Sequence, residues 1–153
     1  MIIRPARTKD ADGIAGVLHD LVLAGKRRKR HDPEFAHGHY IAHRNKIECC
    51  VAESDAGKIL GFQSIKLAKS GNEYGAPVGW ALIGTHIRPK FARRGIGKAL
   101  FAFTLRSAQE ADVPAIEAFI GDTNTQALAY YAAMGFVDYR RAEGAICKCL
   151  YLR

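Results

Sequence analysis

The feature that most constrains the fold is RPKFARRGIGKAL, residues 88–100, where glycines and basic side chains precede a helix-like run. Glycine permits positive φ and close approach to the backbone. Gly95 and Gly97 therefore favour a tight turn, and the helix after it adds free N–H groups and partial positive charge. Basic side chains near the turn can add charge-assisted contacts to an anion. They are Arg93, Arg94 and Lys98. The stretch predicts a strand-to-helix turn that binds a phosphate group.

Two common phosphate-binding patterns do not match this turn. The G-x-x-x-x-G-K-[ST] pattern of nucleoside-triphosphate hydrolases is absent. The dinucleotide pattern G-x-G-x-x-G also fails, because Leu100 occupies the third glycine position. On these residues alone, a plain tight turn on a basic surface stays an alternative to a phosphate site.

Apolar periodicity and turn residues predict the element order β-α-α-β-β-β-α-β-α-β-β. The predicted strands are 1–4, 47–53, 58–68, 78–87, 115–120, 136–141 and 145–152. The first predicted helix is capped by Thr8 or Asp10 and ends at Gly25, and the others are 32–43, 97–111 and 124–134. This order predicts an α/β (α+β) fold: a mixed, mostly antiparallel sheet with a central parallel β-α-β crossover and helices on both faces.

The composition is that of one globular domain spanning residues 1–153. The chain is 48% hydrophobic and 25% charged, and its length suffices to bury a core without staples. The N-terminus is charged early, and no apolar run reaches the ~18 residues of a membrane span. We therefore expect a cytoplasmic protein without membrane contact.

The cysteine spacing does not indicate a metal or redox site. The four cysteines are Cys49, Cys50, Cys147 and Cys149. Neither pair has the C-x-x-C spacing, and both lie in predicted strands, so we expect reduced core residues. The histidines between residues 37 and 43 lack a cysteine or carboxylate that would complete a compact set, so we expect no metal.

The net charge of +8 allows two kinds of partner. A basic surface can bind nucleic acid or a polyanionic small molecule. The charge is concentrated in the block KRRKR, residues 26–30, and around the glycine turn. No helix-turn-helix, zinc-finger or RNP pattern accompanies it, so we do not expect nucleic acid to bind. A basic nucleic-acid-binding module stays the alternative function.

A second motif, NTQALAYYAAMGF, covers residues 124–136. Asn124 is a good helix N-cap, Gly135 can end the helix, and Phe136 returns the chain to a strand. The order strand, RRGIGKAL, helix, strand and N-x(6)-Y-x(3)-G-F resembles the GCN5-related N-acetyltransferase (GNAT) superfamily. The likeness is most specific over residues 78–139, and the element order extends it to the whole chain.

The resemblance implies a GNAT-like acyl-CoA N-acyltransferase fold in a single N-acetyltransferase domain, with acetyl-CoA as co-substrate. In the family, loop amides hold the coenzyme A pyrophosphate, and the preceding strand holds the pantetheine arm and acetyl carbonyl. The matching loop residues are Arg93, Arg94, Gly95, Ile96, Gly97 and Lys98, and the matching strand residues are Thr85, His86 and Ile87. The asparagine that contacts the pantetheine arm matches Asn124. The tyrosine that protonates the leaving thiolate matches Tyr131.

Two further details come from the family pattern. Members often have a β-bulge in the strand before the loop, and Gly84 is where we expect one. The family loop usually begins with Gln or Arg, whereas Ala92 holds that place here. Because the amides matter more than that side chain, we expect only slightly weaker coenzyme affinity.

The implied reaction transfers acetyl to a primary amine. It needs a neutral amine, donors for the oxyanion and a proton for the thiolate. The backbone N–H near Ile87 can serve the second need and Tyr131 the third. The base stays open, because the strand before the loop has no glutamate. Candidates are His86, Glu117, Asp122 and water relaying to a distant carboxylate.

The acceptor is also open. By the resemblance, residues 25–44 build its pocket, and their basic side chains indicate a small amine carrying a carboxylate or phosphate. A solvated basic face explains the same residues equally well. Members of the family are often dimers, and the closing strands are a natural interface for a homodimer. A catalytically silent acetyl-CoA sensor is a further alternative.

Overall fold

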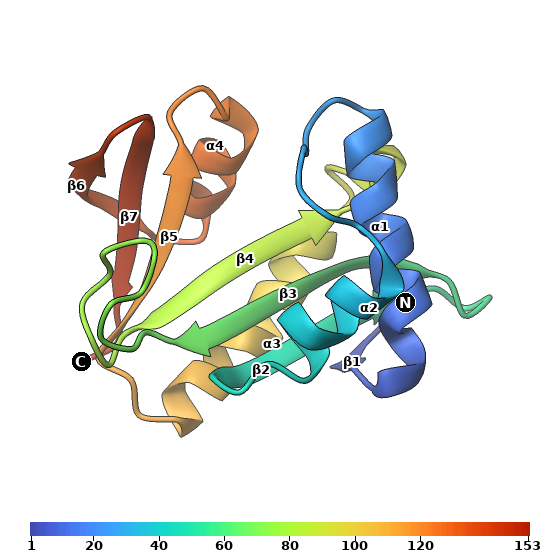
Figure 1. Ribbon diagram of the computed structural model, residues 1–153, viewed down its shortest axis with the longest axis horizontal. Coiled ribbons are helices and arrows are strands. Elements are labelled where there is room, and N and C mark those ends of the chain that lie inside the picture. Colours follow the sequence, from blue (N-terminus) through green and yellow to red (C-terminus); the bar gives the residue numbers. More distant parts are fainter.

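The computed structural model describes residues 1–153, which form a seven-stranded sheet in the order β1-β2-β3-β4-β5-β7-β6 (Figure 1). The strands are β1 (Ile2–Pro5), β2 (Lys46–Glu53), β3 (Ile59–Leu67), β4 (Ala81–Ile87), β5 (Ala115–Gly121), β6 (Val137–Ala142) and β7 (Ala145–Tyr151). Neighbours are antiparallel except β4 and β5, which run parallel. The predicted fold class is confirmed.

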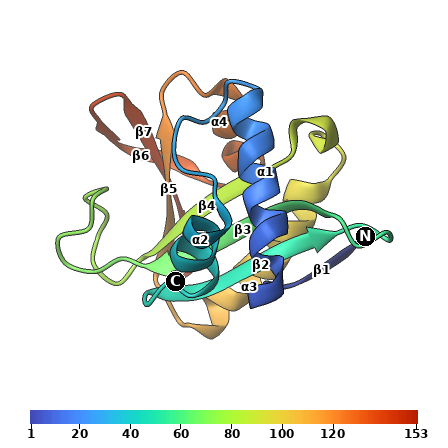
Figure 2. The ribbon, with the colours of Figure 1, turned by 45° about the vertical axis from the view of Figure 1, so that its right-hand side comes forward.

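Helices cover both faces of the sheet. They are α1 (Ala11–Leu23), α2 (Pro33–Ala36), α3 (Ile96–Glu110) and α4 (Thr125–Ala133), with short helical turns η1 (Thr8–Asp10), η2 (His37–Ile41) and η3 (Pro89–Phe91). Figures 1 and 2 show α1 and α2 on one face, here the α1 face, and α3 and α4 on the other, the α3 face. None of these helices is both long and apolar enough to cross a membrane.

Strand alternation assigns each side chain to one face. Ile65, Ile116 and Ala118 pack in one core cluster with residues of α3 and α4. Phe62 packs with α1 in a second cluster. The strand registers then put the even-numbered side chains of β4 and the odd-numbered side chains of β5, among them Glu117, on the α1 face. All four cysteines are free and buried, as expected.

Two details of the predicted strands are wrong. β4 begins at Ala81 rather than at residue 78, because the preceding residues form a turn in which Gly79 has φ 90°. The bulge expected at Gly84 is absent, since β3 and β4 pair without a register shift and Gly84 lies directly opposite Ser64. The bulges of this sheet lie in β2, β3 and β6 instead.

Candidate active site

β4 and β5 pair over two positions and then separate. The pairs join Ala81 to Ile116 and Leu82 to Glu117. Figure 1 shows the two arrows diverging towards their carboxyl ends. The second half of β4 therefore keeps its bonds to β3 but has no strand on its other edge.

The free edge of β4 presents main-chain N–H and C=O groups. The Arg88 N–H donates to the Leu60 carbonyl of β3 at 2.9 Å. Because alternate residues of an antiparallel strand direct their backbone groups to the same neighbour, Thr85 and Ile87 direct theirs to the free edge. His86 differs, because its backbone groups face β3 and its side chain lies on the α1 face.

The turn into α3 carries six consecutive backbone amides, from Arg93 to Lys98, that donate to no backbone carbonyl. The first bond of the helix runs from the Ala99 N–H to the Gly95 carbonyl at 3.1 Å. Arg93 has φ 63° and Gly95 has φ 82°, both in the left-handed region. Successive free amides in such a turn form a concave anion-binding nest, which the helix start reinforces.

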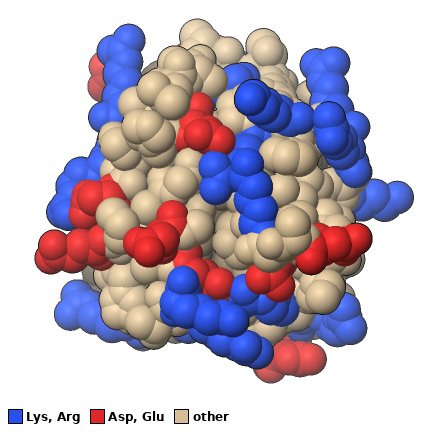
Figure 3. Space-filling view, turned by 90° about the vertical axis from the view of Figure 1, so that its right-hand side faces the viewer, with Lys and Arg blue, Asp and Glu red and all other residues tan.

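Basic side chains accompany the nest. Arg93, Arg94 and Lys98 are exposed and form no ion pair with a carboxylate. Figure 3 shows Lys and Arg side chains gathered in the upper right part of this end of the molecule. Arg88 is engaged elsewhere, since its guanidinium donates to the Ile59 carbonyl at 2.7 Å and to Asp20 of α1 at 2.8 Å. Arg88 therefore has a structural role.

Gly97 is the point where α4 meets the turn. The Tyr130 hydroxyl donates to the Gly97 carbonyl at 2.7 Å. A Cβ on residue 97 would lie 2.6 Å from the Tyr130 ring, so any other residue there would have to displace that ring. Glycine at this position allows α4 to pack closely on the start of α3.

Tyr131 lies on the α3 face beside the free part of β4. Its hydroxyl is 2.8 Å from Thr85 Oγ1, and the residue is only 6% exposed. Burial raises the pKa of Tyr131 well above its usual value, so the phenol keeps its proton at neutral pH. Asn124 is exposed and caps α4, its Oδ1 accepting the Ala127 N–H at 3.1 Å.

Gln63, which the sequence analysis missed, connects these groups. It is fully buried, and its amide donates to Thr85 Oγ1 at 2.9 Å and to the Tyr130 hydroxyl at 3.0 Å. A continuous hydrogen-bonded network therefore joins the α3 turn, through Tyr130, Gln63 and Thr85, to Tyr131. No local pattern reveals Gln63, because its partners lie 22 and 67 positions away in the chain.

An aromatic cluster occupies the α1 face around the end of β4. Its members are Phe35, His39, Tyr40, Phe62 and His86. The His86 ring stacks on Phe62 with centroids 4.8 Å apart, and its buried Nδ1 has no hydrogen-bond partner. Burial, and next the positive charge of Arg27, lowers the pKa of His86 to about 3. His86 is therefore neutral at physiological pH and a weak base.

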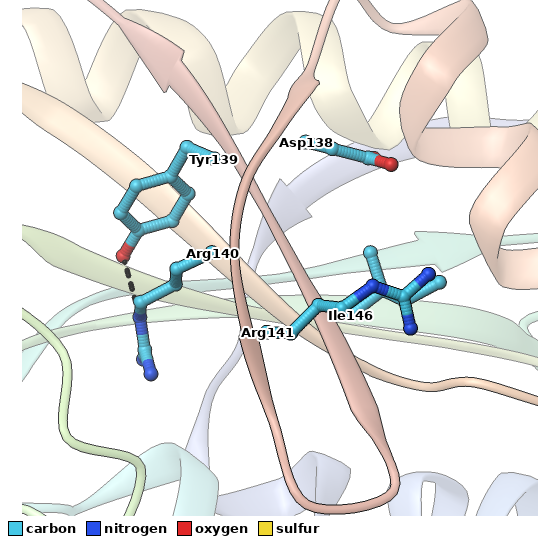
Figure 4. A pocket seen from close by; sticks show the side chains of 5 residues that line it. All are labelled: Asp138, Tyr139, Arg140, Arg141 and Ile146. Atoms are coloured by element: carbon cyan, nitrogen blue, oxygen red, sulfur yellow. Dashed lines mark hydrogen bonds between the residues drawn. The ribbon is translucent and has the colours of Figure 1, made fainter.

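Glu117 is fully buried on the α1 face of β5. Its Oε1 accepts from Arg140 Nη2 at 2.6 Å and from the Tyr139 hydroxyl. A register shift in β6 after Asp138 lets the consecutive residues Tyr139 and Arg140 lie on one side of the strand, as Figure 4 shows. Arg140 also donates to the Tyr74 carbonyl at 2.8 Å. Glu117 thus anchors β6 and the loop before β4, and only its Oε2 has no partner.

Comparison with solved structures shows the same fold at low sequence identity. Ribosomal-protein-alanine N-acetyltransferase from Brucella melitensis is 21% identical, with a TM-score of 0.80 over 99% of this chain and 100% of that one. The yncA protein from Salmonella typhimurium, solved with its cofactor acetyl-CoA, is 18% identical, with a TM-score of 0.78 over 99% and 94%. PaiA N-acetyltransferase from Thermoplasma acidophilum, in complex with coenzyme A, is 13% identical, with a TM-score of 0.76 over 98% of each chain.

No curated protein matches the chain in sequence. A family model does: the model described as the acetyltransferase (GNAT) family matches residues 16–136. The match runs from α1 to the end of α4 and includes the free edge of β4, the α3 turn and both tyrosines. The chain belongs to the acetyltransferase (GNAT) family.

Proposed function

We propose that the protein transfers an acetyl group from acetyl-CoA directly to the primary amine of a small acceptor. The observation that carries the proposal is the run of free amides from Arg93 to Lys98, which follows the free edge of β4 in the chain. Coenzyme A combines a pyrophosphate with an amide-containing pantetheine arm. An anion nest followed by an unpaired strand edge matches that combination.

The proposed coenzyme site uses the residues matched by sequence. The pyrophosphate binds the amides of the α3 turn, with Arg93, Arg94 and Lys98 adding charge. The pantetheine arm pairs with the backbone of Thr85 and Ile87, and the Asn124 side chain reaches it from the start of α4. His86 contributes its side chain on the acceptor side rather than backbone groups. The acetyl-CoA and coenzyme A in two similar solved structures support this ligand.

The proposed chemistry is a direct acyl transfer. The neutral amine nitrogen attacks the thioester carbonyl carbon, the C–N bond forms and the C–S bond breaks. The Ile87 N–H, at the free edge, stabilises the oxyanion. Tyr131 gives its proton to the departing thiolate, the acylated nitrogen releases one proton to solvent, and Tyr131 regains one proton from solvent. The raised pKa of Tyr131 keeps it protonated until the thiolate forms.

The base for the amine stays unassigned in this proposal. A low pKa makes His86 a poor proton acceptor. Glu117 already binds Arg140 and Tyr139, and Asp122 is exposed. Water that relays a proton out of the site is consistent with all three observations.

Acetyl-CoA calorimetry tests the proposal. We expect micromolar binding that Gly97→Glu abolishes, because the new side chain enters the turn and displaces Tyr130. Gly38→Glu is the matched control, since no atom lies within 4 Å of the added Cβ and the site is outside the turn. Circular dichroism confirms that both variants fold.

A second variant pair covers the case in which Gly97→Glu does not fold. Neutralising Arg93, Arg94 and Lys98 together should weaken acetyl-CoA binding by about tenfold or more. Neutralising the equally exposed Lys26, Arg28 and Lys29 removes the same charge and should leave affinity unchanged. No binding of the wild type at millimolar acetyl-CoA would contradict the proposed function.

The acetyl-CoA titration, together with DNA-binding and turnover assays, distinguishes the proposed enzyme from the two alternative functions. Salt-dependent binding of plain duplex DNA without acetyl-CoA binding would favour a nucleic-acid module. Tight coenzyme binding without turnover on any amine would favour a sensor.

As parts of the proposal, residues 1–153 form one catalytic domain, the protein acts in the cytoplasm, and a homodimer forms through β6 and β7. Four free cysteines suit a reducing compartment.

A further inference from the structure

The basic block, residues 26–30, turns one side chain inward. Arg27 is partly buried, whereas the other four residues of the block are exposed. Its guanidinium lies 5.8 Å from the centre of the Phe35 ring and donates to the Arg30 carbonyl at 3.0 Å. Its charge acts on His39, Tyr40, Tyr74 and His86. Arg27 therefore belongs to the surroundings of the aromatic cluster rather than to a solvated face.

Lys66 reaches the same cluster from β3. It is partly buried on the α1 face, and its Nζ lies 5.2 Å from the centre of the Tyr40 ring. It forms no ion pair, and burial lowers its pKa to about 8. An ammonium group withdrawn from water without a counter-charge is costly, and an anionic ligand would remove that cost.

The charges around the cluster are predominantly positive. The charge of Lys29 also acts on His86. Burial, and next the charge of Lys66, lowers the pKa of His39 to about 4, so both cluster histidines are neutral. Glu73 is the acidic residue whose charge acts on His39 and Lys66, and it is exposed. Neither Arg27 nor Lys66 is paired with it.

We infer that the acceptor is a primary amine carrying a carboxylate or phosphate group, which Arg27 and Lys66 bind against the aromatic cluster. The inference rests on the proposed acetyl transfer and narrows its acceptor to an anionic class. It assigns the recognition to one residue of the basic block and to a β3 lysine, not to the block as a whole.

The same positive field suits the chemistry. It favours a neutral amine over an ammonium, and only the neutral amine attacks the thioester. An acceptor without an anionic group gains no binding from the two cations, and a second ammonium is repelled. The positive charges therefore attract amines that carry an anionic group and repel amines that carry a second cation.

Matched acceptor pairs test the inference. An amino acid and its primary amide share the amine but differ in the carboxylate, and phosphoethanolamine and ethanolamine differ in the phosphate. Free coenzyme A thiol is followed at saturating acetyl-CoA for a panel of such pairs. We expect kcat/KM about tenfold or more higher for the anionic member. The type of pair that shows the preference identifies the anion.

Substitutions of Lys66 and Arg27 test whether these two residues cause the preference for anionic acceptors. Lys66→Gln and Arg27→Gln should each raise KM for the anionic acceptor about tenfold and leave KM for acetyl-CoA unchanged. Lys66→Arg keeps the charge and should keep the preference. Lys69→Gln and Arg28→Gln remove one charge from exposed neighbours and should leave the preference intact.

The outcomes separate the two proposals. Equal or faster acetylation of uncharged or cationic amines, or unchanged KM in both variants, overturns the anionic acceptor and leaves acetyl transfer standing. A protein that binds acetyl-CoA but acetylates no anionic amine also overturns it. Absence of acetyl-CoA binding contradicts the proposed function itself.

Discussion

Two adjacent tyrosines of α4, next to the proposed coenzyme site, have different partners. Tyr131 reaches Thr85 on β4, whereas Tyr130 donates to the carbonyl of Gly97 in the α3 turn. We expect Tyr131→Phe to lower kcat by about 10²–10⁴-fold, because the thiolate loses its proton donor. Affinity for acetyl-CoA should change little. Steady-state kinetics with calorimetry measures both quantities.

Tyr130→Phe is the matched comparison, since it also removes one hydroxyl from the same helix. It leaves the Gly97 carbonyl without this partner and loosens the turn, so we expect a higher KM for acetyl-CoA and a smaller change in kcat. If Tyr131→Phe keeps full turnover, Tyr131 is not the proton donor. The split between kcat and KM distinguishes a chemical role from a general loss of packing.

At the residue scale, motifs reveal groups that are close in sequence and miss groups joined by the sheet. Tyr131 and Asn124 are found because one helix fixes their spacing. Gln63 and Lys66 lie in a strand whose pattern is ordinary, and the residues that they contact come from β4, α4 and η2. The basic block is visible in the sequence, but only the structure separates Arg27 from its exposed neighbours.

At the element scale, the β6 bulge allows the buried carboxylate of Glu117 to be paired. It lets Tyr139 and Arg140 both bind Glu117. Arg140→Met should lower the free energy of unfolding by about 3–5 kcal/mol, because it leaves Glu117 buried without its counter-charge. Arg141→Met, on the other side of β6 in Figure 4, should change it by less than about 0.5 kcal/mol. Urea unfolding measures both variants, and equal effects would show that the ion pair contributes no more than surface charge.

The same element shows what strand prediction can and cannot reach. Apolar periodicity predicts where strands and helices lie, and the resulting element order predicts the central crossover. Neither pattern predicts that β7 lies between β5 and β6. A sheet with β6 next to β5 would use the same residues in the same strands. Gly84 fits a bulge by sequence, yet β4 separates from β5 without one, since the pairing simply stops at Leu82.

At the scale of the whole molecule, positive charge gathers at two sites with different consequences. Around the α3 turn it is exposed and free for a polyanionic coenzyme. Around the aromatic cluster it is partly buried, and after burial it is the second cause that lowers the pKa of the nearby His39 and His86. A sequence shows the total charge and its blocks. Only folding shows which cations lie over an apolar surface, where their effect on neighbouring groups is strong.

This arrangement makes stability sensitive to mild acid. The pKa values of His86 and His39, about 3 and about 4, lie below the ordinary 6.5. Between these values the unfolded chain binds protons that the folded protein excludes, so the free energy of unfolding should fall as pH drops below about 6.5. The hydrogen bond from Arg4 is the main cause that lowers the pKa of Asp10 below its ordinary value of 3.8. Protonation of Asp10 therefore reduces the free energy of unfolding only near and below pH 3.8.

Urea unfolding at pH 7.5 and pH 5.0 measures the loss. We expect a lower midpoint at pH 5.0 with an unchanged slope. In His86→Gln the difference between the two pH values should shrink, even if the variant is less stable at both, because one excluded proton is gone. His37→Gln, outside the aromatic contacts, should keep the full difference. A wild-type free energy of unfolding that is flat across this range would mean that the folded protein accepts protons at these histidines, and that burial and the nearby positive charges do not exclude them.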